Sequence, residues 1–459
     1  MEAPLDNPFD GADPEESGIP ALYTYFGQFI DHDLTLGPEG SFQKQRDPDA
    51  LVDFRTPAFD LDCVYGRGPD DQPYLFANDG KSFLLGNAIS GGSAAHAFDL
   101  PRNGADPARA LIGDPRNDEN SIVSQLQGLF LGFHNRLLAE NPGMTFEQAQ
   151  HRTQRHYQYV ILHDFLPTII DGGVLSALQT NGHFDQHKLQ FYHPKNSPFM
   201  PVEFSTAAYR FGHSMIRPGY RLNNQHLLAI FAPAKENDLR GKYAMDPTRG
   251  IDWGRFIDTD IRPYDGAANS TAQQDRLQFA YRMDTSLVNP LAHLPASIAG
   301  NPPPSLPQRN LLRSFSLGLP SGQAVAQAMQ VPVLDDAQIL IGKAVDTPDP
   351  AEPAVPILSI SSSFKGNCPL WTYILAEAAL HQANVPLTAT GGPATITTPR
   401  LGPVGGRMVA EVFLGIMFGD SSSLLRTHPT WTPKSGPNYR LRDFVLYATG
   451  QPAAMTAGA

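Results

Sequence analysis

The segment YTYFGQFIDHDLTL (residues 23–36) places four polar side chains, those of Gln28, Asp31, His32 and Asp33, inside an apolar and aromatic run. On a helix, with about 100° between successive residues, Gln28, Asp31 and His32 share one face, while Asp33 turns to the adjacent side. The segment therefore predicts a buried helix that offers one polar cluster to a ligand and one carboxylate elsewhere. A core histidine held by a neighbouring aspartate is the alternative, because buried polar groups are usually satisfied within the protein.

The composition is that of a globular protein with enough apolar material for a core. Of 459 residues, 41% are hydrophobic and 17% are charged, and the formal net charge is −12. This negative balance disfavours binding to nucleic acid or to an anionic membrane. No apolar run is long enough to predict a membrane span. We expect Cys63 and Cys368, which lie far apart in the sequence, to be buried thiols rather than a disulfide framework.

The first residues, MEAPLDNPFDGADPEE, lack the basic and apolar regions of a secretory leader. A cytoplasmic location and export by a leaderless route are therefore the two expectations. The oligomeric state is left open by the sequence.

Helical periodicity is clear in three segments, 121–140, 146–170 and 405–425. Residues 394–399 (ATITTP) are a weak strand candidate. The chain also contains 42 prolines and 40 glycines, which predict many loops between the helices. The predicted fold class is mainly α: a single large, loop-rich helical domain with few or no strands.

Three further segments each place two polar residues three positions apart, a spacing that shares a helix face. They are Arg116 and Glu119 in GDPRNDENS (113–121), Arg210 and His213 in YRFGHSMI (209–216), and Asn310 and Arg313 in RNLLRSF (309–315). Each pair alone is typical of a solvated surface. Together with residues 23–36 they supply two histidines and three arginines. One histidine to ligate iron, another to act on the open face and cations to meet carboxylates would suit an anionic haem.

In this order, FGQFIDHDLT, GDPRNDE, YRFGHSMI and NLLR resemble the signature blocks of the animal-type haem peroxidases. This peroxidase–cyclooxygenase superfamily includes myeloperoxidase and lactoperoxidase, and the similarity is greatest to its bacterial members. Supporting blocks are LDCVYGRG (61–68), YVILHDFLPTIID (159–171) and LGPVGGRMVAEVFLG (401–415).

The resemblance implies one haem peroxidase domain over residues 1–459, built around a buried haem. The distal-half motifs would lie at 23–140, the proximal-half motifs at 200–320 and a C-terminal helical part at 360–450.

The resemblance also implies roles for individual residues. His32, Arg116 and Gln28 match the distal catalytic residues, and His213 matches the ligand of the haem iron. The other matching haem-binding positions are Asp31 and Glu119, which can form ester bonds to haem b, Arg210 and Arg313 near the propionates, and Asn310, which accepts from the proximal imidazole. Asn120 stands where myeloperoxidase has a haem-linked methionine, so no sulfonium bond is expected.

A calcium ion is the second cofactor that the resemblance implies. In the family, the aspartate after the distal histidine binds Ca²⁺ together with a later loop, here residues 55–66. The implied ligands are Asp33, Thr56, Ala58 through its carbonyl, Asp60 and Asp62. Hard oxygen ligands from a loop and a helix suit Ca²⁺. Without the resemblance, an acidic turn is the simpler interpretation of the loop.

The implied activity is that of a peroxidase, which uses hydrogen peroxide to oxidise small organic donors, with halides as a further candidate, through a ferryl intermediate. A fatty-acid dioxygenase would carry a radical-forming tyrosine three residues before the proximal histidine, where this chain has Arg210 and, one residue further away, Tyr209. A non-catalytic haem or calcium scaffold is the other alternative; the set Gln28, His32, Arg116 and His213 and the lack of an RGD tripeptide argue against it. A metal hydrolase is disfavoured because the sequence contains no HExxH motif.

Overall fold

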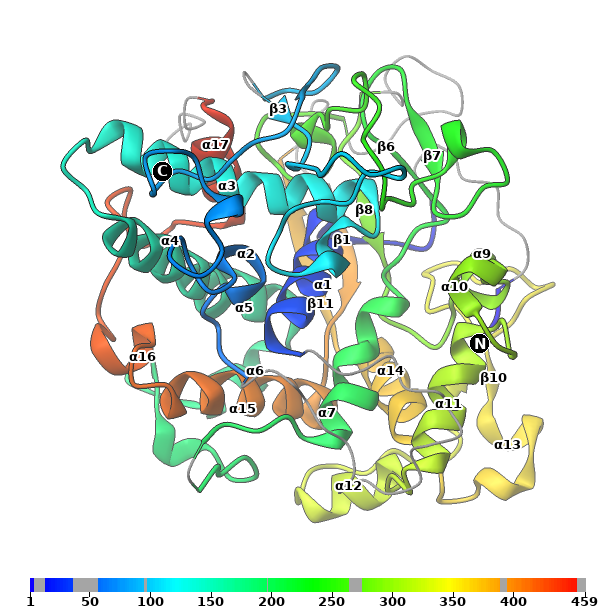
Figure 1. Cartoon of the computed structure of the whole chain (residues 1–459). Coiled ribbons are helices and arrows are strands. Elements are labelled where there is room, and N and C mark those ends of the chain that lie inside the picture. The colour runs from blue at the N-terminus through cyan, green and yellow to red at the C-terminus, as the bar shows by residue number, and fades with distance from the viewer. Residues whose placement is uncertain are drawn as a thin grey trace.

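Helices form the framework of the protein, and Figure 1 shows α1 near the centre of the computed structural model with longer helices around it. The structure describes residues 1–3, 13–35, 57–94, 97–195, 197–263, 275–388 and 394–451. Within these ranges the helices are α1 (Leu22–Leu34), α2 (Asp62–Tyr65), α3 (Ser121–Glu140), α4 (Phe146–Val160), α5 (Leu166–Ile169), α6 (Gly172–Ala177), α7 (Val202–Thr206), α9 (Asn289–Ala292), α10 (Ala296–Ala299), α11 (Leu306–Ser316), α12 (Gly322–Ala328), α13 (Ile357–Ile360), α14 (Leu370–Leu380), α15 (Pro403–Gly419), α16 (Leu424–Thr427) and α17 (Leu441–Thr449). Two 3₁₀ turns, Pro115–Asp118 and Ala208–His213, carry motifs singled out in the sequence.

The strands of the described ranges are short and pair antiparallel in twos. They are β1 (Glu16–Pro20), β2 (Ala88–Ile89), β3 (Ala97–Phe98), β4 (Gln179–Thr180), β5 (His183–Phe184), β6 (Gly219–Arg221), β7 (Leu227–Ala229), β8 (Phe279–Tyr281), β9 (Leu340–Ile341), β10 (Val355–Pro356), β11 (Gln382–Leu387) and β12 (Ala394–Pro399). β1 pairs with β8, and β11 pairs with β12 from Gln382 opposite Pro399 to Leu387 opposite Ala394. The prediction of a mainly α fold with few strands is confirmed, and residues 394–399 form β12.

β1 leads directly into α1 and is held against the β11–β12 pair. The Gly18 N–H donates to Thr398 Oγ1 at 2.7 Å, and a Cβ atom at Gly18 would lie only 2.8 Å from Val385 Cβ. Only glycine therefore allows β1 to approach this closely. The contact fixes the direction in which the chain enters α1.

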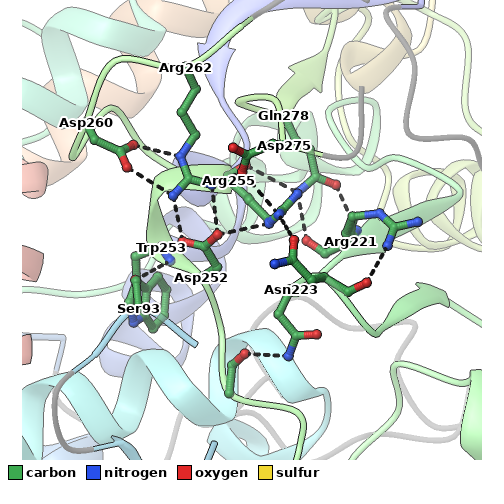
Figure 2. A network of polar contacts seen from close by, with 12 residues as sticks. Ser93, Arg221, Asn223, Asp252, Trp253, Arg255, Asp260, Arg262, Asp275 and Gln278 are labelled. Atoms are coloured by element: carbon green, nitrogen blue, oxygen red, sulfur yellow. Dashed lines mark hydrogen bonds and ion pairs between the residues drawn. The ribbon is translucent and has the colours of Figure 1, made fainter. Parts of the chain in front are cut away.

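A network of arginines and carboxylates lies beside the start of α1 (Figure 2). Arg262 donates to Asp252, Asp260 and Asp275 at 2.7–3.0 Å. Arg255, which is 1% exposed, bonds to Asp252 and Asp275 as well. Cations and carboxylates alternate, so each buried arginine has a charged partner.

The main chain of this region caps α1. Ala21 N–H donates to the Gln278 carbonyl, and Leu22 N–H donates to the Phe256 carbonyl, both at 2.9 Å. The Gln278 side chain in turn bonds to the carbonyls of Arg221 and Arg255 (Figure 2). The first N–H groups of a helix have no partner within the helix, and no side chain caps α1. Backbone carbonyls from other parts of the chain therefore accept the N–H groups that a capping side chain usually accepts.

The apolar face of α1 is packed by aromatic rings. Phe29 stacks on Phe130 of α3 with ring centroids 4.4 Å apart, and Phe26 meets Phe165 edge-on at 5.6 Å. Gln28 and Asp31 are only half-buried, whereas His32 and Asp33 are buried. The helix predicted for this segment is therefore confirmed over Leu22–Leu34, and aromatic packing holds its apolar face.

The three predicted helices are confirmed, with changes at their ends. Residues 121–140 form α3, and residues 405–425 are divided between α15 and α16. Residues 146–170 form α4 and α5 with a π turn, Ile161–Phe165, between them. Asp164 lies in this turn and accepts from the Tyr23 hydroxyl at 2.7 Å and from the Leu441 N–H at 2.8 Å. The π turn thus joins α1 to α17 through one carboxylate.

No helix within the described ranges combines the length and the apolar character needed to cross a lipid bilayer. Cys63 and Cys368 are buried thiols, as predicted.

Candidate active site

The distal cluster consists of Gln28, His32, Arg116, Asn117 and Glu119. Gln28 and His32 come from α1, and the other three lie on or directly after the turn Pro115–Asp118. The structure therefore brings together the four distal residues predicted from the sequence and adds Asn117, which was not predicted.

His32 is oriented by Asn117. His32 Nδ1 lies 2.7 Å from Asn117 Oδ1, and Asn117 Nδ2 donates to Gln127 Oε1 at 2.9 Å. Because the amide nitrogen of Asn117 faces Gln127, its oxygen faces the ring and accepts a hydrogen bond from Nδ1–H. In the neutral ring, Nε2 is then the basic nitrogen; it lies 3.8 Å from Glu119 Oε1.

Gln28 is held at both ends of its amide. Its Nε2 donates to Glu119 Oε1 in a short hydrogen bond, and its Oε1 accepts from Asn120 Nδ2 at 3.3 Å. Asn120 also caps α3 by accepting from the N–H groups of Ile122 and Val123. At the position matched to the haem-linked methionine, this chain therefore has a helix-capping residue that orients Gln28.

Arg116 lies beside His32. The resemblance implies a catalytic role for its guanidinium, but in this structure the N–H groups of the guanidinium bond to Asp114 and to the end of α1. Its guanidinium bonds to Asp114 at 2.7 Å, to the His32 carbonyl at 2.9 Å and to the Thr35 carbonyl at shorter range. The last carbonyls of a helix lack partners within it, and a cation there also complements the helix dipole. Burial alone would lower the pKa of Arg116, but its hydrogen bonds to the Asp114 carboxylate and the charge of that carboxylate raise the pKa above its ordinary value. In this structure Arg116 is therefore a charged cap on the end of α1.

The turn that carries Asn117 is clamped from outside. Arg102 bonds in bidentate fashion to Asp118, at 2.7 and 2.8 Å, and also to Asp99. The Gly241 N–H donates to the Glu119 carbonyl at 2.9 Å, and a Cβ atom at Gly241 would lie 2.2 Å from the Asp118 carbonyl oxygen. These contacts hold the turn in one position, and with it the amide behind His32.

The proximal cluster consists of Arg210, His213, Asn310 and Arg313. His213 ends the turn Ala208–His213, and its Nδ1 lies 3.0 Å from Asn310 Nδ2 on α11. Arg210 Nη1 donates to Asn310 Oδ1 at 2.9 Å. Since a guanidinium has only donors, it keeps the amide oxygen on its own side and turns the amide nitrogen toward the ring. The predicted pairing of Asn310 with His213 is present, but here Asn310 donates to the imidazole, whereas the resemblance implies that it accepts.

The proximal cluster suits an anionic ligand with a metal. Burial, aided by Arg210, lowers the pKa of His213 to about 3, so the imidazole is neutral. Burial and the nearby charge of Arg313 lower the pKa of Arg210 to about 10. Arg210 bonds to the neutral oxygens of Ser205 and Asn310. A half-buried guanidinium next to a second one is stabilised by carboxylates, so these residues fit a haem and its propionates.

Both clusters are connected to α1. The Tyr209 hydroxyl donates to the Gly27 carbonyl of α1 at 3.2 Å, which ties the proximal turn to the distal helix. The Asp31 carboxylate is close enough to both Arg116 and Arg210 to act on them electrostatically. α1 therefore links the predicted residues of the two halves.

A separate cluster of three carboxylates lies behind α1. Oxygens of Asp33, Asp60 and Asp62 lie within 4.8 Å of one another, and Asp33 is 0% exposed. Leu61 has a φ of +59°, a left-handed conformation that places its N–H 3.3 Å from Asp33 Oδ2. Ala58 is half-buried in the same loop, and Thr56 lies outside the described residues. Three carboxylates this close repel one another unless a cation or protons intervene, so the donor set fits a hard cation.

The loop of the carboxylate cluster is fastened to α4 and α3. Gln154 and Gln158 of α4 donate to the carbonyls of Asp60 and Phe59 at 2.6 and 2.7 Å. His134 of α3 accepts at Nδ1 from the Tyr65 hydroxyl and donates from Nε2 to the Lys81 carbonyl, both at 3.0 Å. Since α2 begins at Asp62 and ends at Tyr65, His134 holds the helix that follows the carboxylates.

This role of His134 predicts a loss of stability in acid. Burial lowers the pKa of His134 to about 4, below its ordinary 6.5. The unfolded chain therefore takes up the proton first as the pH falls from about 6.5, and stability falls until about pH 4. His134→Gln should remove about 2–3 kcal/mol of the difference in unfolding free energy between pH 7 and pH 4.5, measured with urea. The exposed His151→Gln is the control; an unchanged pH dependence in His134→Gln would contradict the assignment.

Comparison with solved structures defines the class of fold. Peroxidase A of Dictyostelium discoideum is similar with a TM-score of 0.59 and 15% sequence identity, over 96% of this chain and 87% of that one. A fatty acid alpha-dioxygenase of Arabidopsis thaliana gives a TM-score of 0.51 and 14% identity, over 97% and 71%. The mainly α fold of the chain therefore resembles the fold of these two enzymes.

The sequence comparisons define the family. Residues 43–240, which include Arg116, Glu119, Arg210 and His213, match the family model described as animal haem peroxidase. Thyroid peroxidase of Sus scrofa is 33% identical over 187 residues, which are 36% of this chain and 19% of that protein. The chain thus spans a minor part of the length of this relative. The resemblance inferred from the sequence blocks is confirmed over this segment: residues 43–240 match the animal haem peroxidase family model.

Proposed function

We propose that this protein is a haem-dependent peroxidase that uses hydrogen peroxide to oxidise small organic donors, with halides as further candidate donors. The observation that carries the proposal is the paired histidine arrangement. His32 presents a basic Nε2 because its Nδ1 is bound to Asn117, and the half-buried His213 is neutral beside Arg210. The family of the matched relatives supports an oxidoreductase.

The haem would be held by the proximal cluster. His213 would ligate the iron, and Arg210 and Arg313 would meet the propionates. Asp31 and Glu119 are the carboxylates available for ester bonds to haem methyl groups. When bound, the haem supplies the iron chemistry that activates peroxide and stores oxidising equivalents.

The distal cluster would move the protons. His32 Nε2 would accept a proton from peroxide and return it to the departing oxygen, a function worth about 10²–10⁴-fold in rate. As a free carboxylate, not esterified to the haem, Glu119 at 3.8 Å would stabilise the imidazolium. Arg116 adds positive charge near His32 and holds its backbone. Gln28, oriented by Glu119 and Asn120, would hold a water molecule or a halide.

A direct test is donor oxidation by the full-length, haem-loaded protein. With hydrogen peroxide and a phenol, the protein should turn over many equivalents of donor per haem, and the same amount of free haem is the control. Turnover no faster than that of free haem would contradict the proposal. Replacing the phenol by iodide or bromide then tests halide use.

A second candidate is a fatty-acid dioxygenase, because a structure with that activity shares the fold. In this chain, however, the Tyr209 hydroxyl donates to the Gly27 carbonyl, and Arg210 stands three residues before His213. A polyunsaturated fatty acid and oxygen, without added peroxide, would separate the two activities. Oxygenated fatty-acid products would favour the dioxygenase; their absence, together with donor oxidation, would favour the peroxidase.

We also propose that the cluster of Asp33, Asp60 and Asp62 binds Ca²⁺ and so fixes the helix that carries His32. Saturating calcium should raise the melting temperature over that in EGTA; at about 100 times Kd, binding contributes about 2.7 kcal/mol. Asp60→Asn should reduce this calcium response, because it removes one charge from the cluster. The control is Asp79→Asn, an exposed aspartate in a local turn with Ser82. A melting temperature that ignores both calcium and EGTA would contradict the site.

A further inference from the structure

A chain of two buried amides lies behind His32. Asn117 and Gln127 are each 0% exposed, and they join His32 to α3 through hydrogen bonds of 2.7 and 2.9 Å. Nδ1–H of His32 donates to Asn117, whose Nδ2–H donates to Gln127. Both donors therefore point away from the site, toward α3.

This direction selects one form of the imidazole. A neutral histidine has one N–H, and the ring can carry it on either nitrogen. An oxygen acceptor at Nδ1 favours the tautomer with its proton there and leaves Nε2 as the base. A protonated ring donates from both nitrogens, and then Asn117 keeps Nδ1–H while Glu119 pairs with Nε2–H. The same acceptor therefore serves both charge states of His32 without any rotation of the amide.

The surroundings hold Asn117 in place. Its turn is clamped through Asp118 by Arg102, and a rotation of its amide alone, with Gln127 unmoved, would break the bond to Gln127. Among the described residues, Gln127 Nε2 has no acceptor of its own. Gln127 can therefore turn its N–H toward a carboxylate at position 117, so that Asn117→Asp gains a donor in the same place.

We infer that Asn117 is a positioning residue that fixes the tautomer of His32 and so makes Nε2 the catalytic base. The inference rests on the proposed peroxidase function. Gln127 supports this role by accepting a hydrogen bond from the Asn117 amide, which holds the amide in place.

The first test reads the tautomer itself. In the full-length chain without haem, labelled with ¹⁵N-histidine, the His32 ring should show a protonated Nδ1 and an unprotonated Nε2; His32→Gln identifies its signals. In Asn117→Leu, which removes the acceptor with little change in volume, the ring should divide between the two tautomers. A protonated Nε2 in the unmodified chain, or an unchanged tautomer in Asn117→Leu, would overturn the inference.

The second test uses the haem-loaded protein and peroxide. Asn117→Leu should react about 10–100-fold more slowly, the range typical for loss of a partner that orients a ligand or base. Asn117→Asp should restore much of the rate, with the midpoint of its pH profile moved upward, because a carboxylate stabilises the protonated ring. A wild-type rate and pH profile in Asn117→Leu would contradict the inference.

Asn141→Ala is the matched control. Asn141 bonds to the Leu137 carbonyl at the far end of α3, so its loss weakens the same helix without touching His32. It should leave the tautomer, the rate and the pH profile unchanged. If the unmodified protein does not react with peroxide, the proposed function fails, while the NMR measurement still decides whether Asn117 sets the tautomer.

Discussion

Replacing His32 with alanine should slow the reaction of the haem-loaded protein with hydrogen peroxide by about 10²–10⁴-fold, while haem remains bound. The variant keeps the proximal cluster but has no base within reach of the peroxide protons. The bond to Asn117 and the proximity to Glu119 are lost with the ring. The measurement is stopped-flow absorption in the Soret region at several peroxide concentrations.

The exposed His187→Ala serves as the control for this substitution. It should react at the wild-type rate. A His32→Ala variant that binds haem and reacts with peroxide as fast as the unmodified protein would refute the role assigned to His32. The haem content of each variant, measured before mixing, separates loss of chemistry from loss of cofactor.

Replacing His213 with alanine should remove the iron ligand and with it stable haem binding. The His213 imidazole is neutral, and the remaining residues of the proximal cluster, Arg210, Asn310 and Arg313, carry positive charge or neutral amides. They are able to hold propionates but not iron. We therefore expect the variant to lose its haem during gel filtration, whereas the unmodified protein retains it.

Added imidazole should restore part of the haem spectrum of His213→Ala by occupying the space of the lost ring. The control is His226→Ala, because His226 bonds to Thr248 at 2.7 Å, away from the proximal cluster. It should keep its haem. Full haem retention by His213→Ala, without imidazole, would contradict the assignment of His213 as the ligand.

Much of the helical framework follows from local patterns in the sequence. Residues 121–140 have apolar residues at helical spacing and form α3 with those boundaries. The π turn after α4 was not predicted, because its Asp164 is satisfied by Tyr23 and Leu441, which lie far away in the sequence. Likewise, α1 starts without a capping side chain, since Gln278 and Phe256 provide the acceptors.

The candidate site was predicted as residue types, but not as a hydrogen-bond network. The helical spacing of three residues paired Arg116 with Glu119 and did not identify Asn117. Residues 115–118 in fact form a 3₁₀ turn, to which the spacing of an α-helix does not apply. The position of Asn117 directly after Arg116 in GDPRNDENS was the feature of the sequence that could have indicated it. The orientation of Asn310 depends on Arg210, 100 positions away, which no local pattern reveals. The capping of α1 by Arg116 was not predicted for the same reason, because the carbonyl of His32 that it binds belongs to another part of the chain.

The most direct test of the central claim is an absorption spectrum of the full-length, haem-loaded protein before and after one equivalent of hydrogen peroxide. The account predicts a Soret band that shifts within seconds or faster and returns when a phenol is added. A Soret band that ignores peroxide would contradict the peroxidase function. The absence of any Soret band after reconstitution would contradict the haem site between His32 and His213.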